Sequence, residues 1–200
     1  MPSYKNFNAA IYCPVSDVMG IEDFDDFEKR FAWIEKHVRV GKVYLETYRH
    51  GRTAEPEQVK ELIEFFKKKG IETAGGITTD GPPDGEGGFD PLCYTNSETR
   101  ELLTRVAELT ASLFDEFILD DFYFTNCRCP ACIEAKGDKS WERYRLDLMR
   151  QISEDVIIGP AKKVNPKVKI IIKYPNWYEH FQETGYNLED EPKIFDALYT

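Results

Sequence analysis

Short apolar runs alternate with longer amphipathic segments along the whole chain. Six runs have the length and composition of strands and are bounded by polar or turn-forming residues: 7–15, 42–49, 71–79, 114–121, 167–175 and 194–200. Segments between them carry apolar residues at helical spacing and predict helices over 20–38, 55–70, 96–114 and 140–166. Gly159 and Pro160 predict a bend in the last helix.

Strands that alternate with helices indicate βαβ units and a parallel α/β sheet. A doubly wound sheet usually has a glycine-rich phosphate-binding turn after its first strand, but this chain reads YCPVSDVMG there. A (β/α)8 TIM barrel instead gathers its chemistry at the C-terminal ends of its strands. Polar and aromatic residues occupy these positions after four predicted strands: Glu46, Tyr48, Arg49, Thr78, Thr79, Asp80, Asp120, Asp121, Lys173, Tyr174 and Trp177. The pattern therefore favours the barrel.

The number of strands is smaller than a closed barrel needs. A TIM barrel has eight strands in about 250 residues, whereas the pattern predicts six strands in 200 residues. We therefore expect residues 1–200 to form a single barrel domain, truncated after about the sixth strand. A complete open sheet of six strands is the alternative, and it would leave two unpaired edge strands.

The charge balance narrows the range of partners. The chain has 26 Lys and Arg against 36 Asp and Glu, a formal net charge of −10, which argues against nucleic acid or an anionic membrane as the partner. No apolar run approaches the roughly 18–20 residues of a membrane span. The N-terminus lacks the pattern of a signal peptide. We expect a soluble protein, with a cytoplasmic location and, after removal of a signal, a periplasmic or secreted one both open. The sequence does not indicate the oligomeric state.

Three of the five cysteines lie close together, as Cys127-x-Cys129-x2-Cys132. Their thiols can turn toward one centre, and Cys93 is the natural fourth ligand because loops of neighbouring barrel strands are adjacent. Four thiolates are a typical ligand set for structural zinc, and they leave no open position for catalysis. Unliganded thiols and a redox-active Cys129–Cys132 pair are the alternatives. We expect Cys13 to pack in the core or at the barrel mouth.

Two adjacent carboxylates, Asp120 and Asp121, end the fourth predicted strand. Glycoside hydrolysis uses two carboxyl groups, one of them often protonated at the working pH. In a regular strand only one of the two would face the barrel axis, although a strand that curls at its end could present both. Because like charges raise the pKa of one partner, the pair suits a general acid. We favour Asp121 over Asp120 as the catalytic carboxylate; the alternative is that both only cap the next loop.

The acidic pair and the cysteine loop together resemble a known family. A fourth barrel strand that ends in an acidic pair, followed directly by C-x-C-x2-C, resembles the zinc-bearing β-galactosidases of glycoside hydrolase family forty-two. In that family an Asn-Glu pair supplies the acid/base, and the cysteines hold zinc. The resemblance implies that Asp120-Asp121 replaces Asn-Glu and that Cys93, Cys127, Cys129 and Cys132 hold the metal. Asp is shorter than Glu, so the acid/base role does not transfer directly. Nearly the whole chain also resembles glycoside-hydrolase-like barrel proteins that carry LDDFYFTNC and IIKYPNWYEH.

The other strand-end residues suit a sugar ligand. Aromatic rings can stack on sugar faces, and polar side chains can bind hydroxyl groups. The predicted substrate-binding residues are Glu46, Tyr48, Arg49, Tyr123, Lys173, Asn176 and Trp177. His50 and His180 could line the same cleft, but we interpret them as solvated loop histidines.

The leading hypothesis is a glycoside hydrolase that cleaves an oligo- or polysaccharide and carries a structural zinc. The alternatives are a non-catalytic carbohydrate-binding barrel and a metal-dependent hydrolase, and the absence of H-x-H and H-E-x-x-H patterns weakens the latter. A second catalytic carboxylate is expected from the sixth to eighth strands, with Glu46 as the only substitute. If the barrel is truncated, these 200 residues are expected to be inactive by themselves.

Overall fold

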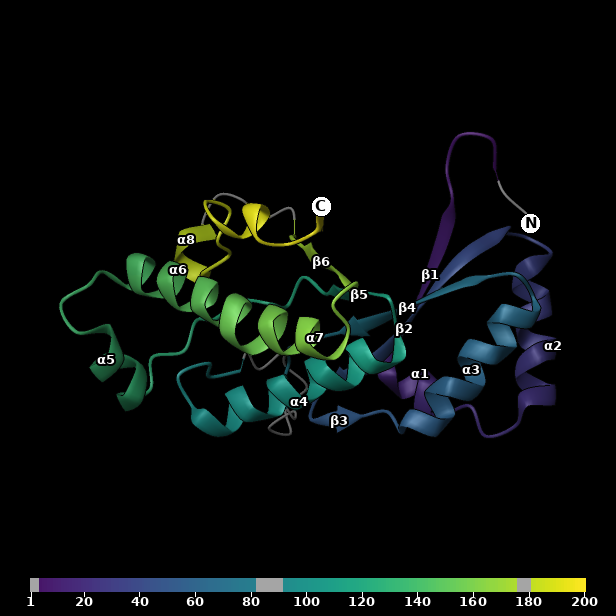
Figure 1. Ribbon diagram of the computed structural model, residues 1–200, viewed down its shortest axis with the longest axis horizontal. Helices are drawn as coiled ribbons and strands as arrows, with labels where there is room; N and C mark the ends of the chain where they lie inside the picture. The colour runs from purple at the N-terminus through teal and green to yellow at the C-terminus, as the bar shows by residue number, and fades with distance from the viewer. Residues whose placement is uncertain (1–3, 82–91, 176–180) are drawn as a thin grey trace.

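Six parallel strands form the centre of the molecule, one after another in sequence order (Figure 1). The computed structural model describes residues 4–81, 92–175 and 181–200. The strands are β1 (Ala9–Cys13), β2 (Val40–Arg49), β4 (Glu72–Ile77), β5 (Glu116–Leu119), β6 (Lys169–Lys173) and β7 (Ala197–Tyr199). A doubly wound sheet reverses its strand order at a switch point. The uninterrupted parallel order is that of a barrel wall.

Side chains on the inner face show that this wall is strongly curved. The hydroxyl oxygens of Tyr44 on β2 and Tyr199 on β7 lie 3.3 Å apart, although β4, β5 and β6 separate these strands in the sheet. Lys42 on β2 likewise donates to Glu116 on β5 over 2.7 Å. A flat sheet would hold strands two places apart about 9–10 Å from each other. The chain therefore forms an incomplete TIM barrel, as predicted.

Helices cover the outer face of the wall. β1 is followed by α1 (Val15–Met19) and α2 (Phe24–Glu35), β2 by α3 (Pro56–Lys68) and β4 by α4 (Ser97–Leu113). Figure 1 shows α2 and α3 side by side at one end, and α4 beside the chain segment that contains α6 and α7. Gly75 allows α4 to approach the sheet closely, because a Cβ there would lie 2.5 Å from Thr110 Cγ2. None of the described helices has the length and apolarity to cross a membrane.

The long helix predicted over 140–166 is found in three consecutive parts. They are α6 (Trp141–Ile152), a π-helical stretch (Ser153–Ile158) and α7 (Gly159–Val164). Pro160 has no N–H to donate, which explains why the regular α-helical pattern is interrupted just before it. Shorter helices are α5 (Pro130–Lys136) after β5 and α8 (Phe181–Thr184) after β6.

The short helices α1, α5 and α8 and the short strand β3 were not predicted from the sequence. β3 (Arg52–Thr53) pairs antiparallel with the end of β2, through a two-residue turn at His50 and Gly51. Both turn residues have positive φ, 53° and 72°, as a type I′ hairpin requires. Two-residue strands leave almost no periodicity in a sequence, so this hairpin could not be recognised by pattern.

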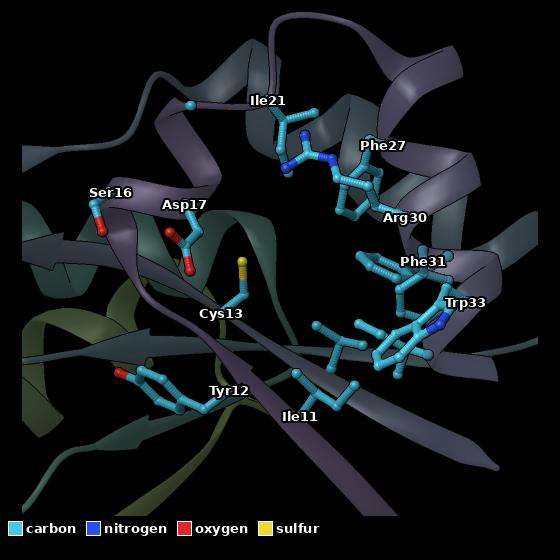
Figure 2. A pocket seen from close by; sticks show the side chains of 14 residues that line it. Ile11, Tyr12, Cys13, Ser16, Asp17, Ile21, Phe27, Arg30, Phe31 and Trp33 are labelled. Atoms are coloured by element: carbon cyan, nitrogen blue, oxygen red, sulfur yellow. The ribbon is translucent and has the colours of Figure 1, made fainter. Parts of the chain in front are cut away.

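A cavity of about 580 Å³ lies beside β1, between this edge strand and helices α1 and α2 (Figure 2). Its walls are mostly apolar side chains, among them Ile11, Phe31 and Trp33. Cys13 also lines it and is partly buried. Burial, with the charges of Asp17 and Glu46, raises the pKa of the Cys13 thiol to about 12, so this cysteine stays protonated.

A fully buried carboxyl, Glu191, lies in the core on the other side of the molecule. Its oxygens accept hydrogen bonds from Ser153 Oγ (2.7 Å) and from the hydroxyl of Tyr174 (3.1 Å). Burial raises its pKa to about 7, although these hydrogen bonds act in the opposite direction. The folded chain therefore keeps Glu191 protonated at pH values at which an unfolded glutamate is ionised.

We expect the contribution of Glu191 to the free energy of unfolding to fall as pH rises from about 4.3, the pKa of an unfolded glutamate, to about 7. Across this window the folded state binds the proton and the unfolded state does not. Glu191→Gln removes this contribution, so the stability of the variant relative to the wild type should rise by about 3 kcal/mol from pH 4 to pH 8. Urea denaturation of both proteins across this range measures the difference. Parallel pH profiles for the two proteins would contradict the protonated state of Glu191.

Candidate active site

Three charged side chains meet at the C-terminal ends of β2, β5 and β6. Arg49 Nη2 lies 3.1 Å from Asp120 Oδ2, and Lys173 Nζ lies 2.8 Å from Asp120 Oδ1. Asp120 directly follows β5, while the other two residues end their strands. Because the carboxyl ends of parallel strands lie at one rim of a barrel, residues far apart in sequence converge there. The structure thus brings together three of the predicted site residues.

Glu46 is the buried anchor of this cluster. Its side chain is 0% exposed and accepts hydrogen bonds from Tyr12 Oη (2.8 Å), Val15 N (2.7 Å), Arg49 Nε (3.0 Å) and the Thr78 hydroxyl. Gly76 makes room for this arrangement, because a Cβ there would lie 2.6 Å from Tyr12 Oη. Glu46 therefore cannot contact a substrate, and its predicted roles in binding and as a substitute carboxylate are corrected. It holds Arg49 instead.

Asp121 lies beside Asp120 and shares its cation. Lys173 Nζ is 3.3 Å from Asp121 Oδ2, so both carboxylates reach the same ammonium group. The hydroxyl of Tyr186 donates to the backbone carbonyl of Asp121 and holds the chain at this point. β5 ends at Leu119, so neither aspartate obeys the alternation of a regular strand. Both acids are therefore presented together.

The two carboxyls differ in pKa. At Asp120 burial alone would raise the pKa, but the hydrogen bond and charge of Lys173, with the charge of Arg49, outweigh it and hold the pKa below its ordinary value. At Asp121 burial and the negative charge of Asp120 outweigh Lys173 and raise the pKa. The Asp121 side chain is also the more exposed, 23% against 10%. Asp120 is thus the more persistent anion and Asp121 the better proton donor.

Two predicted stacking residues belong to the core instead. Tyr48 is 0% exposed and donates to the backbone carbonyl of Asp80 over 3.2 Å. Tyr123 is 1% exposed, and its hydroxyl lies 2.9 Å from Ser153 Oγ. Their rings have no face open to a sugar, which corrects both predictions. Asn176 and Trp177, like His180, lie outside the described residues.

The sequence analysis did not assign roles to Tyr12 and Thr78. Tyr12 projects inward from β1 to Glu46, and Thr78 follows β4 and contacts both Glu46 and Asp120, the latter over 3.4 Å. Thr78 stood among the strand-end residues, so its position was a usable signal. Tyr12 lies within an apolar run and offered none, because its contact with Glu46 depends on the register in which β1 pairs with β2.

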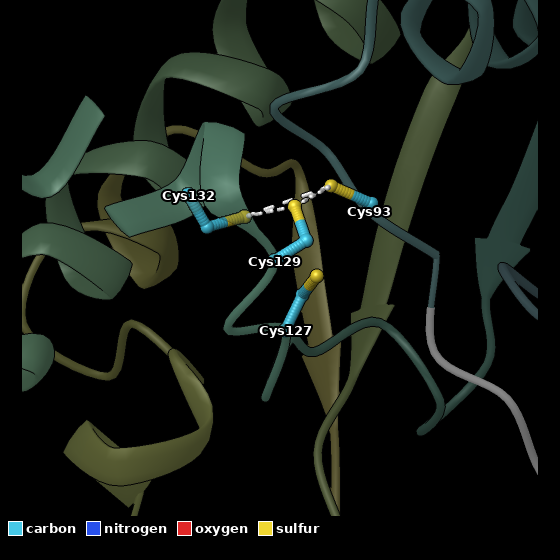
Figure 3. Close-up of side chains that lie close together, drawn as sticks. All are labelled: Cys93, Cys127, Cys129 and Cys132. Carbon is cyan, nitrogen blue, oxygen red and sulfur yellow. Dashed lines mark hydrogen bonds between the residues drawn. The ribbon is translucent and has the colours of Figure 1, made fainter. Parts of the chain in front are cut away.

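The four predicted metal ligands form one cluster (Figure 3). The ligand atoms of Cys93, Cys127, Cys129 and Cys132 all lie within 4.8 Å of one another. Cys93 Sγ is 3.7 Å from Cys129 Sγ and 3.6 Å from Cys132 Sγ. These separations are too long for disulfides, in which sulfurs are about 2.05 Å apart. The set could hold a metal ion.

The surroundings of the cluster favour a thiolate and fix its loop. The backbone N–H of Cys132 lowers the pKa of Cys129 to about 7. Cys129 is the N-terminal cap of α5, where a helix stabilises negative charge.

From α6, buried Arg145 donates to the carbonyl of Asn126 over 3.0 Å and to that of Glu183. The loop after β5 is thereby tied to the segment after β6.

Comparisons with known proteins identify the family to which the chain belongs. A family model described as "Probable glycosyl hydrolase, catalytic domain" matches residues 1–200. An uncharacterized protein of Saccharolobus solfataricus is 30% identical over an alignment 223 residues long. The alignment covers 98% of this chain and 37% of that protein. The chain thus spans little more than a third of the length of this relative.

Solved structures with a similar backbone include the virulence factor SghA from Agrobacterium tumefaciens, with a TM-score of 0.48 and 16% identity over 76% of this chain and 36% of that chain. The GH53 catalytic domain of Ignisphaera aggregans gives a TM-score of 0.44 and 15% identity, over 84% of this chain and 51% of that chain. In both comparisons the matched part is about half or less of the solved chain.

The opposite pKa shifts of the two acids predict unequal effects on stability when each acid is replaced by asparagine. Asp120→Asn should lower the free energy of unfolding at pH 7 by about 2 kcal/mol, because a charged hydrogen-bond acceptor for two cations is lost. This difference should disappear as pH falls through the lowered pKa of Asp120. Asp121→Asn removes a charge that the site disfavours and should change stability by less than about 0.5 kcal/mol. Urea denaturation of both variants tests this, and a larger loss for Asp121→Asn would contradict the assignment.

Proposed function

The chain belongs to the family of probable glycosyl hydrolase catalytic domains, and from this premise we propose that it cleaves glycosidic bonds in an oligo- or polysaccharide by carboxylate acid/base catalysis. The observation that carries the proposal is the pair of adjacent acids with opposite pKa shifts at the barrel rim. Environments that push two pKa values apart assign one acid and one anion to a site.

In this proposal Asp121 is the general acid/base. Burial and the charge of Asp120 raise its pKa above the ordinary value, which favours the protonated form, and its carboxyl is the more accessible of the two. It would donate a proton to the leaving oxygen of the glycosidic bond. Asp120 stays ionised between Arg49 and Lys173. Its charge keeps the pKa of Asp121 high and can stabilise positive charge that develops on the sugar ring.

The substrate-binding groups in the proposal are Lys173 and Arg49, with Asn176 and Trp177 from outside the described residues. Arg49 donates to two carboxylates, and its side chain is 17% exposed, so its main task is to hold Asp120. Lys173 is 38% exposed and can also reach a hydroxyl group. The second carboxylate of a glycoside hydrolase is expected from the sixth to eighth strands of such a barrel.

The alternative of a metal-dependent hydrolase finds less support. Its ligands would be Asp120 and Asp121, but Arg49 and Lys173 already neutralise this pair. A divalent cation would have to compete with both side chains. A non-catalytic carbohydrate-binding barrel remains the contrasting outcome in the activity test below.

Asp121→Asn should lower kcat/KM on unactivated aryl glycosides about 10²–10⁴-fold, the usual contribution of a positioned general acid. The loss should be much smaller for dinitrophenyl glycosides, because such a leaving group departs without protonation. The assay uses the longest natural chain that contains these residues and a panel of aryl glycosides. Asp138→Asn, at an exposed aspartate after α5, is the matched control.

Two results would contradict this assignment. Equal losses on both kinds of leaving group would exclude an acid role for Asp121. Sugar binding without turnover in the wild type would instead identify a non-catalytic carbohydrate-binding barrel.

We also propose that Cys93, Cys127, Cys129 and Cys132 hold a structural zinc ion. A tetrahedral zinc with ligand bonds of about 2.3 Å has sulfurs about 3.8 Å apart. The sulfurs of Cys93, Cys129 and Cys132 are already 3.6–3.7 Å apart, and that of Cys127 lies within 4.8 Å of them. Four thiolates leave no open position, so the ion would stabilise structure and take no part in the reaction. It would join the loop after β4 to the loop after β5.

Zinc analysis after dialysis in reducing buffer should give about one ion per chain. Cys129→Ser should lose this ion and lower the melting temperature by about 5 °C or more, because metal binding is coupled to folding. Cys13→Ser, a cysteine outside the cluster, should keep the metal. A zinc content near zero in the wild type, or equal contents in both variants, would contradict the proposal.

A further inference from the structure

A histidine and a buried aspartate form a pair at the same rim, outside the acid cluster. His50 Nδ1 lies 3.0 Å from Asp80 Oδ2. The Asp80 side chain is 1% exposed, while that of His50 is 32% exposed. His50 is therefore not the solvated loop histidine that we expected from the sequence.

The backbone conformation at His50 also sets this residue apart from an ordinary loop histidine. His50 occupies the first position of the two-residue turn after β2, with φ of 53°. Turns of this type are most often Asn-Gly, since asparagine and glycine adopt this conformation at least cost. An imidazole at this position is longer than an asparagine side chain and reaches Asp80, which follows β4.

The pair is close along the chain to two residues that contact Asp120. Arg49, the neighbour of His50, donates to Asp120 over 3.1 Å. Thr78, two residues before Asp80, also contacts Asp120. The His50–Asp80 pair thus lies where β2 and β4 end, whereas Lys173 approaches the acids from β6.

The Asp80 carboxylate lies 3.0 Å from Nδ1, and its negative charge favours the tautomer that carries its proton on that nitrogen. Nδ1 is buried against Asp80, so the 32% exposure of the His50 side chain belongs to its other atoms, and Nε2 is the remaining nitrogen. A neutral imidazole in this tautomer accepts a hydrogen bond at Nε2. A sugar hydroxyl is a suitable donor.

We propose that His50 is a substrate-binding residue that accepts a hydrogen bond from a sugar hydroxyl at Nε2, and that Asp80 is its positioning residue. This inference rests on the proposed function, because it places the sugar across the rim from Asp121 toward the β2–β4 side. It adds two residues to the site and defines a hydroxyl-recognising position distinct from the carboxylates.

The test compares four variants of the longest natural chain on the best aryl glycoside of the panel. His50→Asn keeps the turn but shortens the side chain, and it should raise KM about tenfold, the usual loss for one hydrogen bond in a binding site. The kcat should stay within about twofold, because uniform binding is removed. His50→Gln, with a longer amide, should recover part of the loss. His37→Asn, at an exposed histidine after α2, should behave like the wild type.

Asp80→Asn tests the positioning role by a readout that a purely structural change would not produce. Nitrogen-15 NMR of the histidine side chains should show His50 protonated at Nδ1 in the wild type and a mixture of tautomers in Asp80→Asn. The chain has 3 histidines, so the His50 and His37 variants assign the signal. KM should rise in Asp80→Asn in parallel with the tautomer change.

The outcomes separate this inference from the proposed function. Turnover that depends on Asp121, with unchanged KM in His50→Asn and Asp80→Asn, would overturn the role of His50 alone. An unperturbed tautomer in Asp80→Asn would overturn the positioning role. Wild-type protein that neither binds nor cleaves any glycoside of the panel would overturn both the inference and the proposed function.

Discussion

The guanidinium of Arg49 is the interaction on which the site depends. It donates to Glu46, which is 0% exposed, and to Asp120 across the rim. A buried carboxylate is tolerated only when its charge is paired and its oxygens are hydrogen-bonded. Arg49 meets this need for Glu46 and at the same time fixes Asp120. The lowered pKa of Asp120 and the raised pKa of Asp121 both follow from this arrangement.

Curvature of the sheet is the precondition for that interaction. Arg49 is on β2 and Asp120 follows β5, with β4 between them. The bend that brings these strand ends together also brings Tyr44 to Tyr199 on the inner face. Gly76 contributes by leaving space for Tyr12, which reaches Glu46 from β1. The same curvature therefore shapes the barrel interior and assembles the charged cluster.

The acids and the cysteines of segment 118–137 lie in different parts of the structure. The acids end β5 and face the rim, whereas the thiols lie in the following loop and at the start of α5. Arg145 and Tyr186 tie this segment to the chain after β6, through the carbonyls of Asn126, Glu183 and Asp121. Rigid support around catalytic groups limits the loss of geometry that would slow a reaction.

Local patterns were sufficient for the six main strands, the four longer helical segments, the parallel order and the residues that gather at the rim. Alternating runs predicted the six main strands, and spacing alone grouped Cys127, Cys129 and Cys132, because ligands close in sequence are close in space. Only the tertiary structure shows which of the strand-end side chains are buried and which residues they contact. Tyr48, Tyr123 and Glu46 stand at strand ends like Lys173, yet they are buried and Lys173 is not. His50 became more than a loop residue only when β4 brought Asp80 to it. Sequence determines which side chains reach the rim, but the curvature of the sheet and the neighbouring strands determine which of them face the solvent.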